Sequence, residues 1–263
     1  MRFLRDTLTS GLRRRELVWE TTRRELAGQN QGSMLGLLWL VVAPLVQVGA
    51  YVVIISLVFR NRGGGANPFD YALYVLSGMV PWQLLTRSLQ DAPSLLRDKM
   101  DLIKQVIYPI ETLPLPRIAL NAIGPLVALG IYLVLAAVTG NLHWTVVLLP
   151  VPAALLLLLC VGISWGLSII GVVVKDLPNL IGLALSFLIY LSPVVLSETM
   201  VGPRVWSWIL LNPLSHVVLC FRDVFGATFH PASWLIFAAM TLGSVVVGAL
   251  LMQRSKLLIN EYI

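Results

Sequence analysis

The sequence predicts an all-α integral membrane protein. Of its 263 residues, 57% are hydrophobic and only 12% are charged, and the mean hydropathy is +0.84. This balance lies far from that of soluble domains. Apolar runs of about twenty residues recur along the chain, which is the length that an α-helix needs to cross a bilayer, whereas membrane β-barrels have short alternating strands. The membrane-spanning elements are therefore expected to be helices.

Six such runs are expected to span the membrane. Their ranges are 34–59, 71–95, 118–138, 146–174, 177–196 and 232–252. They form a transmembrane domain, 34–263, which is preceded by an N-terminal segment, 1–33. This segment contains seven arginines but no apolar core followed by small residues, so it is not expected to be a cleavable signal peptide.

The positive charges predict the orientation in the membrane. With the N-terminus in the cytoplasm, 15 of the 19 lysines and arginines fall in or beside cytoplasmic segments. Cytoplasmic flanks of membrane proteins carry such an excess. We therefore expect both termini in the cytoplasm. The net charge of +6 is expected to favour contact with anionic membrane lipids, and no nucleic-acid partner is expected.

The N-terminal segment contains a predicted amphipathic helix. The residues near one side of this helix are Leu8, Leu12, Trp19 and Leu26, and most of the arginines fall around the other side. Glu20 and Arg24 are spaced for an ion pair within the helix. This pattern suits a helix that lies on the membrane surface, with Trp19 as an interfacial anchor. A solvated charged helix is the alternative.

The side chains of the spans predict no catalytic residues, no metal site and no cofactor in this chain. The span interiors hold almost no charge, and the sequence contains neither a zinc-binding motif nor a P-loop. Neutral polar residues such as Gln47 and Gln83 are expected to form hydrogen bonds between helices. Cys160 falls inside the fourth span and Cys220 in the outer segment, so we expect two free thiols.

Five sequence motifs occur in a recognisable order. They are REL.GQNQGSMLGLLW..VAPL, SGMVPWQLLTRSLQDAPSLL, DLIKQVIYPIETLPL, SPVVLS and LNPLSHVVLCFRDV. From about residue 23 to its end, the chain resembles the permease subunit of polysaccharide-export ABC transporters. The likeness is greatest to O-antigen permeases, with teichoic-acid and capsule permeases as relatives. No single motif is decisive, but five in order over six spans are specific.

The resemblance implies a channel-forming permease that exports a lipid-linked polysaccharide of the O-antigen type across the bacterial inner membrane. It implies a homodimer driven by two copies of a separate subunit that binds ATP and Mg²⁺. Undecaprenyl pyrophosphate is a candidate for the lipid carrier. Two alternatives stay open. One is an ABC permease for a drug or small hydrophobic compound. The other is a membrane-bound glycan-modifying enzyme, which would need catalytic carboxylates or histidines in a cavity.

The segment 191–230 is expected to form an outer re-entrant region. Its first part is too apolar for a loop in water and is interrupted by Pro193 and Pro203, while Trp206 and Trp208 suit a membrane interface. The resemblance implies a short helical hairpin that dips into the outer leaflet and acts as a gate. An ordinary outer loop is the alternative. The following helix contains an arginine and an aspartate, at 222 and 223, whose side chains are expected to pair.

The segment 96–117 is the longest internal cytoplasmic segment expected. Asp98, Lys99, Asp101 and Lys104 give it a polar surface. The resemblance implies that this segment supplies the coupling helix, which sits in a groove of the ATP-binding subunit. A solvated connector that rests on the headgroups is the alternative.

Two further groups of residues are candidates for substrate contact. Trp39, Gln47 and Tyr51 follow one stripe along the first span and are candidates for lining the channel, where aromatic rings would stack against sugar rings. Packing or headgroup contact is the alternative. A set of arginines is suited to bind the pyrophosphate of a lipid carrier or lipid headgroups: Arg13, Arg14, Arg15, Arg23 and Arg24.

Overall fold

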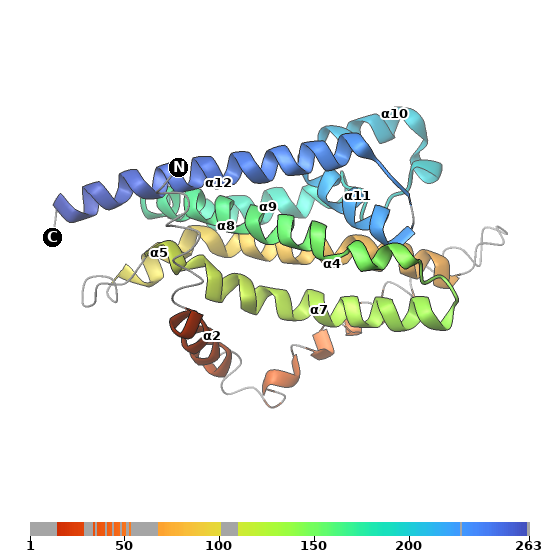
Figure 1. The fold of residues 1–263 in the computed structure, drawn as a ribbon, viewed down its shortest axis with the longest axis horizontal. Helices are drawn as coiled ribbons and strands as arrows, with labels where there is room; N and C mark the ends of the chain where they lie inside the picture. The colour runs from red at the N-terminus through yellow and green to blue at the C-terminus, as the bar shows by residue number, and fades with distance from the viewer. Residues whose placement is uncertain are drawn as a thin grey trace.

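The computed structural model describes residues 15–28, 34, 36–39, 41–43, 45–47, 49–50, 53, 68–100, 110–226 and 228–261. In these ranges the chain is helical and contains no strand, so the all-α prediction is confirmed (Figure 1). The longer helices are α2 (Arg15–Gly28), α4 (Pro68–Asp91), α7 (Pro114–Val138), α8 (Pro150–Val173), α9 (Leu177–Leu188), α10 (Glu198–Leu211), α11 (Pro213–Gly226) and α12 (Pro231–Glu261). The shorter ones are η1 (Gly36–Leu38), η2 (Ala92–Ser94), α5 (Leu95–Asp98), η3 (Ile110–Thr112) and η4 (Trp144–Leu148).

Prolines mark where many of these helices begin. A proline in the first turn costs no hydrogen bond, because the first N–H groups of a helix have no acceptor within it, and the fixed φ of proline suits the helix. The helices that start at a proline are α4, α7, α8, α11 and α12. These helix starts therefore have a local cause in the sequence.

Three described helical stretches are long and apolar enough to cross a membrane, namely Ile110–Val138, Trp144–Val173 and Pro231–Ser255. The α10–α11 pair passes the same test only when both helices are taken together, which raises the number of candidate spans in the described residues to as many as four. Helix α4 has 24 residues but is not among the stretches that pass this test. The chain is thus a multi-pass membrane protein, while the total of six spans stays a prediction.

One predicted span boundary is wrong. The fifth span, expected over 177–196, is a helix of 12 residues that ends at Leu188. A proline ring clashes with the carbonyl four residues earlier, so Pro193 opposes a helix that continues through Ile189. The last span, expected over 232–252, agrees with the apolar stretch Pro231–Ser255, and its helix continues to Glu261. Much of the first span lies outside the described residues.

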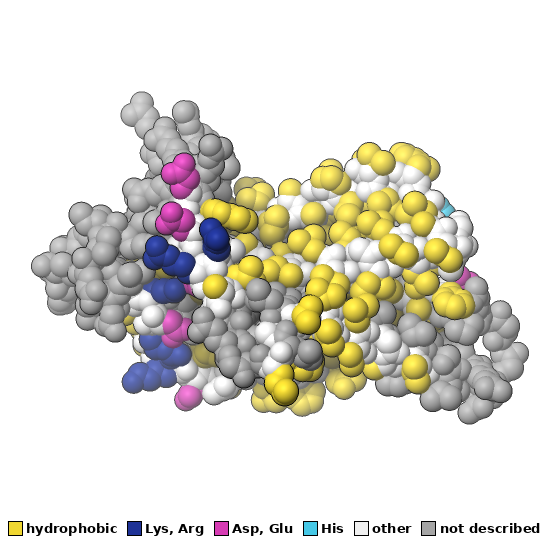
Figure 2. Space-filling model, turned by 90° about the horizontal axis from the view of Figure 1, so that it is seen from below, with side chains coloured by type: hydrophobic (Ala, Val, Ile, Leu, Met, Phe, Trp, Pro, Cys, Tyr) yellow, Lys and Arg dark blue, Asp and Glu magenta, His cyan; other side chains and the backbone are white. Residues whose placement is uncertain are grey.

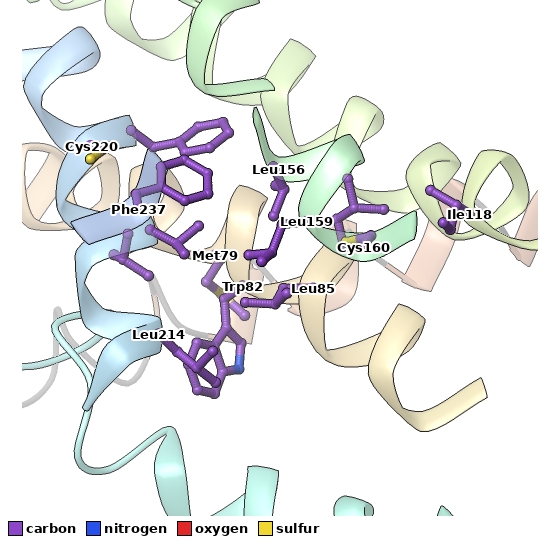
Figure 3. Close-up of a cluster of buried hydrophobic side chains, with 14 of the residues drawn as sticks. Met79, Trp82, Leu85, Ile118, Leu156, Leu159, Cys160, Leu214, Cys220 and Phe237 are labelled. Carbon is purple, nitrogen blue, oxygen red and sulfur yellow. The ribbon is translucent and has the colours of Figure 1, made fainter. Parts of the chain in front are cut away.

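Apolar packing around α8 holds the bundle together. Leu159 and Cys160 on α8 belong to one buried cluster with Trp82 on α4 and Phe237 on α12 (Figure 3). Because lipid is as apolar as this core, its stability comes from close packing more than from removal of side chains from water. Cys160 and Cys220 are both buried free thiols, as predicted.

Two glycines allow α8 and α12 to approach closely. A Cβ on Gly162 would lie 2.6 Å from the backbone nitrogen of Val245, and a Cβ on Gly248 would collide with the carbonyl oxygen of Gly162. Small residues at a helix interface let two backbones come together and so increase their van der Waals contact. The α8–α12 pair is therefore tight because of these positions.

The two ends of the bundle differ in charge. Figure 2 shows basic and acidic side chains gathered at one end, next to a broad hydrophobic surface. We call the end that holds α5 and the start of α7 the charged end. The opposite end, which holds α10 and α11, is called the bent-pair end (Figure 1). Among the lysines and arginines that the structure describes, only Arg204 and Arg222 belong to α10 or α11.

Candidate functional site

Helices α10 and α11 meet in a sharp bend of 112°. Asn212 lies between them, and its side chain links the start of α11 to the turn after α9. Its Oδ1 accepts a hydrogen bond from the N–H of Leu214 at 3.0 Å, and its Nδ2 donates to the carbonyl of Leu191 at 3.0 Å. Asn212 thus caps the first turn of α11, and Pro213 supplies a favourable first helical residue.

The turn between α9 and α10 is held by tyrosines of α4. The Tyr71 hydroxyl donates a hydrogen bond to the carbonyl of Val195 at 2.6 Å, and the Tyr74 hydroxyl donates to the carbonyl of Leu196 at 2.8 Å. The two tyrosines are three positions apart on a helix, so both side chains face the same neighbour. Carbonyls outside helices need such partners in apolar surroundings.

Arg222 on α11 binds the same turn. One guanidinium nitrogen donates to the carbonyls of Val194 at 3.0 Å and Tyr74 at 3.1 Å, and the group lies 3.4 Å from the centroid of the Tyr74 ring. The side chain is 8% exposed, and no described carboxylate forms an ion pair with it. Carbonyl dipoles and the ring face therefore stabilise this buried cation. We call Tyr71, Tyr74 and Arg222 the turn clamp.

Asp223 has different partners, so the predicted pairing of Arg222 with Asp223 is wrong. Its Oδ1 accepts from the Thr228 hydroxyl at 2.9 Å and lies 2.6 Å from Nδ1 of His230. Its Oδ2 accepts from the backbone N–H of His230 and from Nε1 of Trp234, both at 2.8 Å. Adjacent helical residues point about 100° apart, so the two side chains face different elements. Asp223 fastens the connection between α11 and α12.

Ion pairs join helices at the charged end. Nε of Arg117 lies 2.8 Å from Oδ2 of Asp91, and Asn121 donates to the same oxygen at 2.9 Å. These contacts link the end of α4 to the start of α7. Nζ of Lys99 lies 2.7 Å from Oε1 of Glu25, which links the residue after α5 to α2. All four charged side chains are partly exposed.

The connection from α4 to α5 packs on α8. Ala92 and Pro93 in η2 are buried, as is Leu96 in α5. A Cβ on Gly171 of α8 would lie 2.6 Å from the Cα of Pro93. Only a glycine lets the two backbones come this close. The start of the predicted coupling segment is therefore held by packing as well as by the Lys99–Glu25 ion pair.

The structure describes two of the four predicted coupling residues. Asp98 and Lys99 lie at and just after the end of α5. A carboxylate oxygen of Asp98 lies 4.0 Å from Nε of Arg97, and Lys99 pairs with Glu25 on α2. The other two residues lie outside the described ranges: Asp101 and Lys104. The coupling role stays a prediction.

The predicted N-terminal helix is present as α2, although the structure does not test its place at a membrane surface. Arg24 lies 4.0 Å from Glu20, which confirms the predicted pair, and Trp19 is 69% exposed. Arg23 and Arg24 are both exposed. The remaining arginines proposed for carrier binding have no described side chain: Arg13, Arg14 and Arg15.

Of the predicted channel residues, Trp39 and Gln47 are described and Tyr51 is not. The Trp39 side chain is exposed. Gln47 accepts a hydrogen bond from Nε2 of Gln83 on α4 at 2.9 Å, which is the kind of bond predicted for polar residues in the spans. The channel-lining role of these residues stays a prediction.

The predicted gate residues lie in and around α10. Pro193 is buried in the turn after α9. Pro203 follows Gly202, whose positive φ of 76° breaks the helical course of α10, so both prolines lie at helix interruptions as predicted. Trp206 is half-buried, whereas Trp208 is 69% exposed. A role in gating stays a prediction for all four residues.

The turn clamp was not predicted from the sequence. The signal that was available is an arginine at 222 within an otherwise apolar stretch, because a buried cation requires acceptors or an aromatic face. Tyr71 and Tyr74 gave a second signal, since two hydroxyls on one helix face must find partners when buried. Neither signal identifies which backbone carbonyls accept the hydrogen bonds. These carbonyls lie in the turn that follows α9.

The all-helical architecture, the apolar helices and the bent pair define a multi-pass membrane protein with a helical break near one end of its bundle. The family model described as ABC-2 type transporter matches residues 16–226, and the chain belongs to this family. Members are membrane subunits of ABC transporters, which work with an ATP-binding partner. The chain therefore has a transport role.

Three relatives share much of the chain. An O-antigen export system permease protein RfbA from Klebsiella pneumoniae is 27% identical over 248 residues, which cover 92% of this chain and 92% of the relative. A protein of the same name from Myxococcus xanthus is 27% identical over 89% of this chain and 90% of its own. A second such protein from Klebsiella pneumoniae is 25% identical over 80% of each chain.

Proposed function

We propose that this protein is the channel-forming permease that exports a lipid-linked polysaccharide of the O-antigen type across the bacterial inner membrane. This proposal rests on the similarity to relatives named as O-antigen export permeases. For two of them the similarity covers 92% and 89% of this chain. ATP and Mg²⁺ are bound by a separate subunit, and this chain supplies no catalytic residues. Two copies of each subunit form the transporter.

In this proposal the charged end faces the cytoplasm. The described lysines and arginines at this end support the orientation, because cytoplasmic flanks carry an excess of positive charge. Six helices span the membrane, and α2 lies on its cytoplasmic surface with Trp19 at the interface. The exposed Arg23 and Arg24 of α2 attract the pyrophosphate of undecaprenyl pyrophosphate or other anionic headgroups.

The bent-pair end then lies in the outer leaflet, where α10 and α11 form the re-entrant hairpin. The 112° bend supports this placement. Non-helical backbone at membrane depth requires protein partners, and the turn clamp supplies them to the turn between α9 and α10. The channel lies between the two permeases of the dimer, with Trp39, Gln47 and Tyr51 on its wall.

The segment 96–117 contacts the ATP-binding subunit and transmits the movement of that subunit to the helix bundle. The packing of Pro93 against Gly171 supports this role, because a lever must be joined firmly to the helices that it moves. Asp98, Lys99 and the residues that follow present the polar surface for the partner. The contact between Lys99 and Glu25 also joins this segment to α2.

Co-purification tests the proposal. The full chain is expressed with the ATP-binding subunit from its host, and the isolated complex is examined by mass spectrometry for bound lipid-linked sugars. We expect a complex of two permeases and two ATP-binding subunits that retains such lipids. Deletion of the permease gene should trap the glycan in the cytoplasmic leaflet. Glycan export that continues unchanged after the deletion would refute the function.

A further inference from the structure

A cavity of about 470 Å³ opens at the bent-pair end, with lining residues from α4, α7, α10 and α11. This volume lies within the range of about 300–1,000 Å³ that is typical of small-molecule sites. Tyr74 and Arg222 of the turn clamp belong to the lining, as does His230 from the Asp223 network. The hydrogen bonds of the turn clamp and of Asp223 therefore hold part of the cavity wall in place.

Aromatic side chains from four helices belong to the lining. Tyr132 and Phe225 lie with their ring centroids 4.3 Å apart, and Tyr74 and the half-buried Trp206 of α10 join them. The face of an aromatic ring carries partial negative charge, which attracts the weakly positive C–H groups on one face of a sugar ring. Tyr132 and Phe225 are almost fully buried, and Arg222 covers one face of the Tyr74 ring. The half-buried Trp206 therefore offers the main stacking surface to a saccharide.

Polar groups suited to hydroxyls surround these rings. Asn141 donates a hydrogen bond to Oδ1 of Asp70 at 3.0 Å, and both side chains line the cavity. Glu198 adds a second carboxylate and Thr199 a hydroxyl. Carboxylates accept hydrogen bonds from sugar hydroxyls, whereas the asparagine amide donates them.

The charges of the lining favour a neutral ligand. Its charged residues are Asp70, Glu198 and Arg222, so the described lining is net negative when its histidines are neutral. The single arginine is already bound to two carbonyls and a ring. An anion such as a lipid phosphate would meet more repulsion than attraction here. Uncharged hydroxyl groups meet no such penalty.

We propose that this cavity binds one neutral sugar unit within a single protomer, at a site separate from the predicted channel stripe. The statement that this sugar belongs to the exported glycan rests on the proposed function. Because the wall combines Glu198 and Trp206 of α10 with residues of α4, α7 and α11, a bound sugar connects α10 to the body of the bundle. The cavity thereby makes the position of α10 sensitive to the glycan.

The test measures sugar binding to the full transporter in phosphatidylcholine nanodiscs, which avoid detergents with sugar headgroups. The neutral probes are D-galactose, D-mannose, L-rhamnose and N-acetyl-D-glucosamine, and the anionic probes are D-glucuronate and inorganic phosphate. Saturation-transfer NMR gives the Kd of each sugar, and phosphorus NMR follows phosphate. We expect saturable binding of at least one neutral sugar with a Kd of about 1–10 mM, in the range of a weak small-ligand site.

Matched variants locate the binding. Trp206→Leu should weaken it by about tenfold or more, which corresponds to about 1.4 kcal/mol. Asn141→Ala changes a different part of the cavity wall and should also weaken sugar binding. Trp144→Leu is the control, because Trp144 is 78% exposed at the same end and does not line the cavity. Thermal unfolding of each variant checks that it is folded.

Three results would overturn the proposal: saturable binding by none of the neutral sugars, binding that both cavity variants leave unchanged, or tighter binding of an anionic probe. If no neutral sugar binds to a transporter that exports its glycan normally, the cavity proposal is rejected and the proposed function stands. If sugar binds in the cavity but deletion of the chain leaves glycan export intact, the proposed function is rejected and the cavity proposal stands.

Discussion

The bent-pair end and the charged end use different interactions to hold non-helical backbone. At the bent-pair end, half-buried tyrosines of α4 and the buried Arg222 of α11 donate hydrogen bonds to the carbonyls of Val194, Val195 and Leu196. At the charged end, partly exposed ion pairs such as Lys99–Glu25 join the elements, and one close backbone contact holds η2 against α8.

The two kinds of interaction differ in strength because their surroundings differ. A hydrogen bond from a charged group contributes about 1.5–3 kcal/mol, whereas a surface ion pair contributes about 0–1 kcal/mol and weakens with salt. The bent-pair end is therefore built to keep one geometry. The ion pairs at the charged end can break and re-form at little cost in free energy, which suits the proposed coupling to an ATP-binding subunit.

Removal of the Arg222 guanidinium should give the largest effect. Arg222→Met leaves the carbonyl of Val194 without this donor and removes the contact with the Tyr74 ring. We expect a loss of about 2–4 kcal/mol in the free energy of unfolding, seen as lower abundance in the membrane and a lower unfolding temperature. Arg204→Met is the control, because Arg204 is exposed on α10. Equal stability of the two variants would show that the turn clamp contributes little.

Gly171→Ala tests the tight contact at the charged end. The added methyl would collide with the backbone of Pro93, so we expect η2 to shift away from α8 and the protein to lose about 1–3 kcal/mol of stability. Substrate-stimulated ATPase activity of the complex should fall with it. Gly130→Ala on α7 is the control, since a Cβ there meets nothing within 4 Å. If Gly171→Ala behaves like this control, the docking of η2 is not required.

The two tyrosine hydroxyls should contribute less than Arg222. The double variant Tyr71→Phe and Tyr74→Phe keeps both rings and removes the donors to Val195 and Leu196. We expect a loss of about 1 kcal/mol for each hydroxyl and faster amide hydrogen exchange across the turn 189–197. Tyr190→Phe, at a side chain that is 74% exposed in the same turn, serves as the control. Unchanged exchange in the double variant would contradict the clamp.

The Lys99–Glu25 pair should give the smallest effect. A double-mutant cycle with Lys99→Gln and Glu25→Gln should yield a coupling energy of about 0.5 kcal/mol at low salt, which declines as salt is added. The more exposed Arg24–Glu20 pair, at 4.0 Å, should yield still less. A coupling that exceeds about 2 kcal/mol, or that does not respond to salt, would place this pair in the same class as the turn clamp.

The sequence alone determined the broad character of this protein. Hydrophobicity and run length predicted an all-helical membrane protein, and motif order predicted the family that the comparison confirms. The free thiols, the Glu20–Arg24 pair and the interruptions near Pro193 and Pro203 were also predicted correctly. Each of these depends on residues close together in the chain or on its overall composition, which a sequence records directly.

Tertiary structure alone decided which polar groups meet. Arg222 and Asp223 are neighbours of opposite charge, yet each has its own partners, and one acceptor of Arg222 lies 148 residues away on α4. The contact between Pro93 and Gly171 likewise joins two distant segments. A buried polar group takes the partner that packing brings within hydrogen-bonding distance and direction. That partner depends on how helices assemble in space, which no local pattern of residues specifies.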